Sequence, residues 1–221
     1  MGRSVEIKVC GMTREDDLEQ ALALGVDYLG FIVYPKSPRG RPLEQAARLA
    51  AQVPVGQRVV VDVEPSVDDL KRYLDAGFDR FQIHLSLPLR METVAAWSEL
   101  VGRQRLWLAP RISPRDEFPQ SILQYADTVL LDTYSKHQVG GTGQTGDFRR
   151  FASLQQQYAA TQWVLAGGLT PVNVIEAIQR SGAHRIDVNS GVETAPGIKD
   201  PAKLSELFGV LSQDSSAARA G

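Results

Sequence analysis

Short apolar runs alternate with longer segments whose apolar residues recur at helical spacing, and this alternation repeats eight times along the chain. In the first unit, residues 5–9 read as a buried strand, and residues 15–24 place their apolar side chains on one face of a helix. Thr13 is placed to cap that helix, and Gly25 to end it. The first unit therefore predicts a strand followed by a helix.

The other seven units follow the same plan, and the fifth is the least regular because its helix has to follow a proline-rich stretch. The further predicted strands are residues 28–33, 58–63, 81–83, 106–109, 128–131, 163–165 and 185–188. The further predicted helices are residues 43–51, 67–76, 91–100, 120–126, 148–158, 172–181 and 202–211.

Eight strand–helix units in about 210 residues match the (β/α)8 or TIM barrel, in which buried parallel strands lie inside a ring of helices. A doubly wound open sheet has the same alternation, but no Gly-x-Gly-x-x-Gly follows a strand in a dinucleotide-binding arrangement. No linker or low-complexity insert divides the chain. We therefore predict an α/β fold with a single barrel domain over residues 1–212 and a frayed polar tail over residues 213–221.

The composition narrows the classes of function. The chain of 221 residues is 43% apolar and has a formal net charge of -2, so it lacks the basic field that nucleic acid or anionic lipid attracts. Its apolar runs are far shorter than the ~20 residues that cross a bilayer, and its start lacks the apolar region of a signal peptide. The single cysteine, Cys10, excludes an intramolecular disulfide and fits a reducing compartment. We predict a cytoplasmic protein with no nucleic-acid or membrane partner.

In barrels of this kind the active site is built at the carboxyl ends of the strands, so the residues that follow each predicted strand are the candidates for chemistry. Their polar groups include a thiol, carboxylates and basic side chains, and two of the segments are rich in glycine. These residues are Cys10, 34–39, Glu64, His84, Arg111, Asp132, 166–168 and 189–191.

Two glycine-containing segments end the seventh and eighth strands: Ala166-Gly167-Gly168 and Asn189-Ser190-Gly191. Loops at these two places often bind phosphate in (β/α)8 barrels, because bare backbone N–H groups there point at the anion. Tight strand-to-helix turns would suit the glycines equally well. The occurrence of both segments together favours a phosphate site.

Cys10 and Asp132 follow strands on nearly opposite sides of the predicted barrel. Taken alone, a free cysteine is usually a small buried apolar residue, and an aspartate at a strand end is often a loop cap. Taken together, the two groups could flank one substrate as a proton-transfer pair, provided that their pKa values are tuned apart.

Several sequence blocks, in the same order and spanning residues 8 to about 208, resemble those of the phosphoribosylanthranilate isomerase family. Several ordered blocks are much more specific than any one motif. The blocks are residues 8–13 (KVCGMT), 30–39 (GFIVYPKSPR), 130–132 (LLD), 140–145 (GGTGQT), 166–174 (AGGLTPVNV) and 187–193 (DVNSGVE).

The resemblance implies an isomerase of tryptophan biosynthesis that converts N-(5-phosphoribosyl)anthranilate into 1-(2-carboxyphenylamino)-1-deoxyribulose 5-phosphate by an Amadori rearrangement. It implies that Asp132 is the general acid that protonates the furanose ring oxygen, and that Cys10 is the general base that removes the C2′ proton. Cys10 then needs a lowered pKa or help from the substrate, whereas Asp132 needs a raised pKa. The reaction requires no cofactor.

The same resemblance implies how the phosphosugar substrate is held. Arg39 would lie near the anthranilate end or the developing charge, Gln82 would contact the substrate, and Asp187 would contact it or orient the loop. The implied phosphate-binding residues are Gly167, Gly168, Asn189, Ser190 and Gly191. No apolar stripe marks a subunit interface, so we predict a monomer.

Two strands depart from the family pattern. The usual Gly-Val-Phe-Val-Asn of the third strand is replaced by residues 60–64 (VVDVE), in which Asp62 points away from the mouth and Glu64 stands where an amide is expected. The usual Gln-Leu-His-Gly after the fourth strand is replaced by residues 82–85 (QIHL), and we expect His84 to be a hydrogen-bonding loop residue. These departures bear on the anthranilate pocket more than on the acid–base pair.

Three further polar residues have open roles. Arg111 is either an extra anion ligand or a solvated charge, and His137 lies in a long loop where it could shape a lid. His184 precedes the eighth strand and is expected to be structural. The three histidines are scattered along the chain, so we predict no metal site.

Two alternative functions stay open at this point. A sister Amadori isomerase of histidine biosynthesis acts on a substrate with a phosphate at each end, but the first half of this chain has no equivalent of the glycines at 167 and 168. A non-catalytic barrel that binds a phosphorylated ligand would be favoured by loss of Cys10 or Asp132, and both are present.

Overall fold

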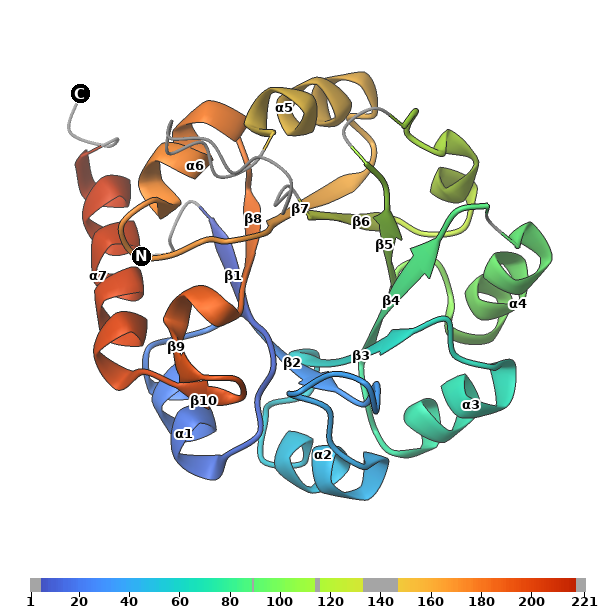
Figure 1. Ribbon diagram of the computed structural model, residues 1–221, viewed down its shortest axis with the longest axis horizontal. Helices are drawn as coiled ribbons and strands as arrows, with labels where there is room; N and C mark the ends of the chain where they lie inside the picture. Colours follow the sequence, from blue (N-terminus) through green and yellow to red (C-terminus); the bar gives the residue numbers. More distant parts are fainter. Residues whose placement is uncertain (1–4, 89, 114–115, 133–146, 218–221) are drawn as a thin grey trace.

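The eight strands pair in parallel in the order of the sequence, and the last strand closes onto the first (Figure 1). The computed structural model describes residues 5–88, 90–113, 116–132 and 147–217. The strands are β1 (Glu6–Val9), β2 (Tyr28–Ile32), β3 (Arg58–Val63), β4 (Arg80–Ser86), β5 (Leu106–Arg111), β6 (Thr128–Asp132), β7 (Gln162–Ala166) and β8 (Arg185–Val188). The predicted (β/α)8 barrel is confirmed.

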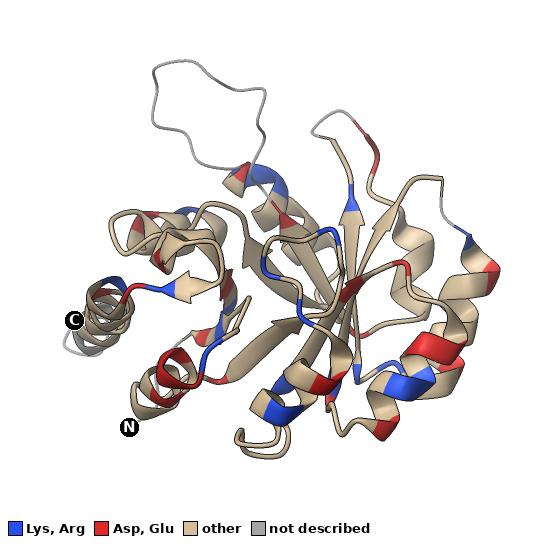
Figure 2. Cartoon of the chain, turned by 60° about the horizontal axis from the view of Figure 1, so that its bottom comes forward, with Lys and Arg blue, Asp and Glu red and all other residues tan. Residues whose placement is uncertain are grey.

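Helices form a ring outside the barrel (Figure 1). They are α1 (Glu15–Ala23), α2 (Leu43–Ala50), α3 (Val67–Asp75), α4 (Met91–Val101), α5 (Phe148–Gln157), α6 (Val174–Ser181) and α7 (Pro201–Ala217). Figure 2 colours acidic residues red and basic residues blue, and both kinds occur along the outer helices. In the fifth unit the connection is the 3₁₀ helix η1 (Gln120–Gln124), because the five residues after Pro119 are too few for a stable α-helix.

Strand alternation divides the side chains between two environments. Ile7 and Val9 of β1 point outward into the main core between the strands and the helices. Lys8, between them, points toward the barrel axis and is fully buried. Because β1 pairs with β8 with Lys8 opposite Asp187, the closing seam of the barrel carries two charged residues side by side.

The amino-terminal end of the barrel is filled by aromatic and arginine side chains. The rings of Tyr28 and Trp107 meet edge to face at a centroid distance of 5.1 Å, and the Arg185 guanidinium lies 5.2 Å from each ring centroid. Arg185 also pairs with Glu6 and donates to Gln162 Oε1. Cations over aromatic faces and satisfied polar groups make this end a closed floor.

The start of α1 differs from the prediction, while its end agrees. Arg14 occupies the N-cap position without a side-chain cap, so the predicted capping role of Thr13 is wrong. The Thr13 hydroxyl instead donates to the carbonyl of Gly197, which lies between two short strands that the hydrophobic pattern did not predict, β9 (Glu193–Ala195) and β10 (Ile198–Lys199). Gly25 follows the helix with a φ of 78°, the left-handed conformation expected of a terminating glycine.

The last helix continues past the predicted domain boundary. α7 runs to Ala217, and residues 218–221 lie outside the described part of the chain. The division between barrel and tail at residue 212 therefore stays a prediction. None of the helices in the described ranges combines the length and the apolar character that crossing a membrane requires.

Candidate active site

A cavity of about 430 Å³ opens at the carboxyl ends of the strands. Cys10 reaches it from the end of β1, Gln82 and His84 from β4, and Asp132 from the end of β6. Residues 166–169, at the end of β7 and just past it, and Asp187, Asn189, Ser190 and Gly191, at the end of β8 and just past it, also line the cavity. The apolar side chains of Ile32, Val61 and Leu130 complete its lining. The cavity therefore brings together the predicted proton-transfer pair and all five predicted phosphate-binding residues.

A second cavity, of about 480 Å³, adjoins the first one because His84, Leu130 and Asp132 line both. It extends toward the end of β5, where Arg111 is exposed and lines it. A ligand longer than a sugar phosphate could therefore continue past Asp132 toward a cationic side chain.

Beside Cys10, Lys8 forms a buried ion pair with Asp187, whose nearest atoms are 2.8 Å apart. Burial disfavours a charge on Lys8, but Asp187 and Cys10 together outweigh it and raise the pKa of Lys8, so the amine stays protonated. Burial raises the pKa of the Cys10 thiol, while the positive charges of Lys8 and Lys199 oppose that rise. Of the two conditions stated for Cys10, a lowered pKa or help from the substrate, the first is therefore not met by the protein groups around the thiol.

Gln82 and His84 share one wall of the cavity. Gln82 Nε2 lies 3.1 Å from His84 Nε2, and Gln82 Oε1 is buried without a hydrogen-bond partner among the described residues. Burial, with the charges of Lys8 and Arg111, lowers the pKa of His84 to about 4. The imidazole is therefore neutral near pH 7, and the buried Gln82 oxygen is an acceptor without a partner among the described residues.

The two glycine loops lie against each other at the other wall. Gly167 and Gly168 have φ values of 102° and 63°, which favour glycine. A Cβ on Gly191 would lie 1.9 Å from the carbonyl oxygen of Leu169, so only glycine fits between the loops. Asn173 Nδ2 donates to the carbonyl of Gly168 and holds the first loop in place.

Arg39 is bound within the protein. Its guanidinium forms a bidentate pair with Glu193, with Nη2 2.6 Å from Oε2, and Lys199 Nζ lies 2.9 Å from the other carboxylate oxygen. Burial disfavours the Glu193 carboxylate, but Arg39 and Lys199 outweigh it and lower its pKa. Arg39 is not among the residues that line the cavity, and its predicted contact with the substrate stays a prediction.

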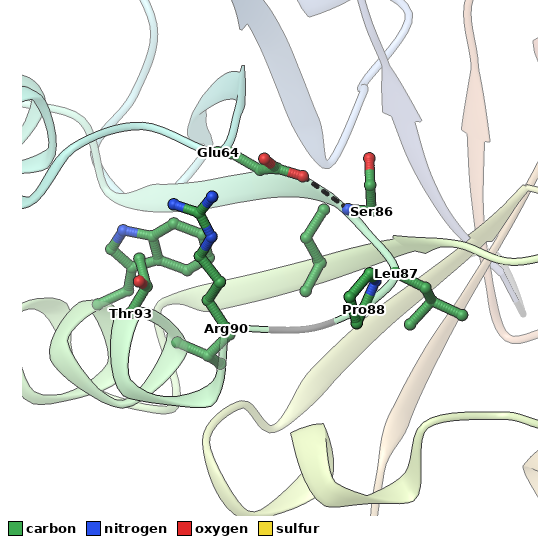
Figure 3. Close-up of a pocket in the computed structure, with 9 residues that line it drawn as sticks. Glu64, Ser86, Leu87, Pro88, Arg90 and Thr93 are labelled. Atoms are coloured by element: carbon green, nitrogen blue, oxygen red, sulfur yellow. Dashed lines mark hydrogen bonds between the residues drawn. The ribbon is translucent and has the colours of Figure 1, made fainter.

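The two acidic residues of β3 have separate surroundings. Asp62 accepts a hydrogen bond from the Tyr73 hydroxyl of α3 at 2.7 Å, so it points away from the mouth as expected. Glu64 has a φ of 47°, a left-handed conformation that asparagine tolerates better than glutamate. Its carboxylate accepts from the Ser86 amide and lines a separate pocket of about 310 Å³, which Arg90 also lines (Figure 3).

Three residues of the site were not among the sequence candidates: Lys8, Glu193 and Lys199. Lys8 could have been found, because strand alternation places it on the same side of β1 as Cys10. The ion pairs of Glu193 depend on the unpredicted β9–β10 hairpin and had no local signal.

The other two histidines and the metal prediction can be compared with the structure in part. His184 is exposed, and its carbonyl accepts a hydrogen bond from the Glu6 amide, which fits its structural prediction. His137 lies outside the described residues. No group of three or more metal-ligating side chains occurs in the described ranges.

Comparisons with known proteins point to one family. Residues 7–210 match the family model described as N-(5'phosphoribosyl)anthranilate (PRA) isomerase. The chain is 36% identical over 213 residues to the N-(5'-phosphoribosyl)anthranilate isomerase of Cereibacter sphaeroides, covering 92% of this chain and 97% of that protein.

Two solved structures agree with that match. Phosphoribosyl anthranilate isomerase from Thermotoga maritima superposes with a TM-score of 0.77 at 30% identity, over 95% of this chain and 99% of that one. A phosphoribosyl anthranilate isomerase in complex with reduced 1-(O-carboxyphenylamino)-1-deoxyribulose 5-phosphate superposes with a TM-score of 0.75 at 26% identity, over 95% and 99% of the two chains.

Proposed function

The chain belongs to the N-(5'-phosphoribosyl)anthranilate isomerase family, and we propose that Cys10 and Asp132 are the general base and the general acid of its Amadori rearrangement. The enzyme isomerises N-(5'-phosphoribosyl)anthranilate in tryptophan biosynthesis. The observation that carries the assignment is that Cys10 and Asp132 line one cavity from β1 and β6, with the two glycine loops forming the wall between them.

The proposed sequence of steps follows from this arrangement. Asp132 gives a proton to the ring oxygen as the bond between that oxygen and C1′ breaks, and the nitrogen lone pair forms the C1′ Schiff base. Cys10, as the thiolate, removes the C2′ proton, and the electrons of that C–H bond form the enolamine. Return of a proton to C1′ and loss of the proton from the C2′ hydroxyl give the ketone, so no external oxidant or reductant is needed.

Substrate binding in this proposal uses the two ends of the cavity. Backbone N–H groups of the loops at Gly167, Gly168 and residues 189–191 hold the phosphate, and Gln82, which lines the cavity, contacts the sugar. Asp187 contributes mainly through Lys8, because its carboxylate is already bound to that ammonium group. Arg39, held by Glu193, is the proposed cation at the anthranilate end.

The test generates the substrate in situ and follows the loss of its fluorescence with the wild type, Cys10→Ala and Asp132→Asn. General acid–base groups contribute about 10²–10⁴-fold, so both variants should lose at least about a hundredfold in kcat. Asp68→Asn, at an exposed position of α3, is the matched control and should keep full activity. Either variant retaining wild-type turnover would contradict its assignment.

Deuterium at C2′ of the substrate separates the two roles. In Cys10→Ala, removal of the C2′ proton becomes the slow step, so we expect a full primary isotope effect on the remaining turnover. In Asp132→Asn, ring opening becomes the slow step and the isotope effect should fall toward one. The reverse pattern would exchange the two assignments.

The enzyme acts on a small molecule, and we propose that it does so as a monomer in the cytoplasm. The large apolar side chains exposed in the described ranges are Val55, Leu87, Val172 and Ile198. They lie in three different connections and on β10, so they belong to no common helix or strand face. The proposed base requires a reduced thiol, which favours a reducing compartment. Light scattering on a gel-filtered sample tests the oligomeric state, and a mass near 48 kDa would overturn the monomer, since one chain has 24.2 kDa.

A further inference from the structure

The surroundings of Cys10 pose a chemical problem for a base. The side chain is buried, and burial raises the pKa of its thiol, whereas removal of a C–H proton requires the thiolate. A positive charge that lies beside the sulfur and cannot move away would solve the problem.

Lys8 has that position. It precedes Cys10 by two residues on β1, so strand alternation turns both side chains toward the barrel axis. Both approach the same point of β2, because a Cβ built on Gly30 would lie 2.8 Å from Cys10 Sγ and 3.0 Å from Lys8 Nζ. The absence of a side chain at residue 30 therefore lets the ammonium group and the sulfur meet.

Asp187 holds the ammonium group in place. Its carboxylate oxygen lies 2.8 Å from Lys8 Nζ, across the pairing of β1 with β8, and the Lys8 side chain has no exposed surface. A buried lysine with a single carboxylate partner has ammonium protons left for a second acceptor. The nearest group of suitable chemistry on β1 is the Cys10 sulfur.

We propose that Lys8 is the positioning residue of the reaction: its ammonium group, anchored by Asp187, stabilises the thiolate of Cys10 in the buried site. This inference rests on the proposed role of Cys10 as the base and adds the group that makes that role possible. In this proposal Lys8 does not contact the reacting atoms of the substrate and affects the reaction through the sulfur of Cys10.

The other charged or titratable groups around Cys10 come from β10, the loop after β2, β8 and β4. Lys199 on β10 favours the thiolate but is engaged by Glu193, and Arg39 on the loop after β2 is paired with the same carboxylate. Asp187 on β8 opposes the thiolate. His84 on β4 is neutral at catalytic pH, because burial lowers its pKa to about 4. Lys8 is therefore the cation that favours the thiolate most and that Glu193 does not engage.

Direct titration of the thiol tests the inference without relying on turnover. Cys10 is the only cysteine of the chain, so thiolate absorbance near 240 nm and the pH dependence of alkylation report this residue alone. The variants are Lys8→Met, Asp187→Asn, the double variant, and Lys71→Met as a control that changes the net charge equally at an exposed position of α3.

We expect Lys8→Met to raise the pKa of the thiol by at least about one unit, which is a tenfold loss of thiolate below that pKa. Asp187→Asn should lower it, because a negative charge beside the sulfur is removed. Lys71→Met should leave it unchanged. The acid limb of the kcat/KM profile of Lys8→Met should move by the same amount as the thiol, with KM nearly unchanged, so activity returns in part at high pH.

The double variant separates this electrostatic role from a structural one. Removing both charges avoids leaving an unpaired buried carboxylate, so Lys8→Met/Asp187→Asn should regain most of the thermal stability that Lys8→Met loses. Its thiol pKa should nevertheless stay above that of the wild type. If Lys8→Met alone fails to fold, the thiol pKa of the double variant tests the inference.

An unchanged thiol pKa in both lysine-free variants would overturn the inference, as would a loss of activity that is equal at every pH. If the thiol shifts as expected while Cys10→Ala remains active, the stabilisation of the thiolate by Lys8 stands, and the assignment of Cys10 as the base fails. The two outcomes are thus distinguishable.

Discussion

The two ends of the barrel are built from the same eight strands, yet they use polar residues in opposite ways. At the amino-terminal end, Arg185 is held by two aromatic rings, Glu6 and Gln162. At the carboxyl end, two residues further along β8, Asp187 faces a cavity together with a thiol and a buried amide oxygen that has no partner among the described residues. The polar side chains at the amino-terminal end are engaged in contacts that stabilise the fold. Those at the carboxyl end line the cavity in which a ligand would bind.

The largest expected effect tests the closed end. Trp107→Ala should lower the free energy of unfolding by about 3–5 kcal/mol, because the ring is 1% exposed and its removal leaves a cavity beside Tyr28 and Arg185. Urea unfolding followed by circular dichroism measures this change. Activity per folded molecule should fall much less than in Gly191→Ala. If Trp107→Ala lost activity without losing stability, the proposed difference between the two ends would be wrong.

The second prediction concerns the open end. Gly191→Ala should raise KM by about a hundredfold, equivalent to roughly 2.7 kcal/mol, because the added Cβ would lie 1.9 Å from the backbone oxygen of Leu169 and push the two loops apart. Steady-state kinetics measure it. Gly209→Ala is the matched control, since nothing lies within 4 Å of a Cβ there, and helix α7 should gain about 0.5–1 kcal/mol. A wild-type KM in Gly191→Ala would contradict the proposal that these loops bind the phosphate.

The smallest effect is a dependence of stability on pH that originates at the open end. The pKa of His84 is lowered to about 4 in the folded protein. Between pH 6.5 and 4, the imidazole is therefore protonated in the unfolded chain but mostly neutral in the folded one. The free energy of unfolding should therefore fall by about 2 kcal/mol as the pH drops through that window. Urea unfolding at several pH values measures this change.

His84→Asn should flatten that part of the stability profile. His184→Asn, at an exposed position before β8, should leave the profile unchanged. An identical slope in the wild type and His84→Asn would assign the pH dependence to other groups.

The sequence was sufficient for the parts of the molecule that repeat. The strands and α-helices of the barrel follow from apolar periodicity, and the ends of β7 and β8 follow from their glycines. The β9–β10 hairpin was missed because strands of three and two residues carry no period. The 3₁₀ form of η1 was missed because a pattern locates a short helical turn without distinguishing its type.

Within the site, residue types could be placed at the mouth from sequence, but their partners could not. Cys10, Asp132 and the glycine loops follow from the rule that strand ends carry the chemistry. The pairing of Arg39 with Glu193, 154 residues later, is a three-dimensional fact that no local pattern encodes. The same holds for Lys8 and Asp187, which are 179 residues apart.

The 179-residue separation of Lys8 and Asp187 has a consequence for the synthesis and folding of the enzyme. The proposed base sits on the first strand, and the carboxylate that anchors its cation sits on the last, so the reactive centre is absent until the ribosome has delivered β8 and the barrel has closed. A nascent chain that ends before residue 187 has the thiol and Lys8 but lacks the carboxylate that anchors the ammonium group. Catalytic competence therefore requires that β8 has paired with β1, and turnover reports the closure of the barrel.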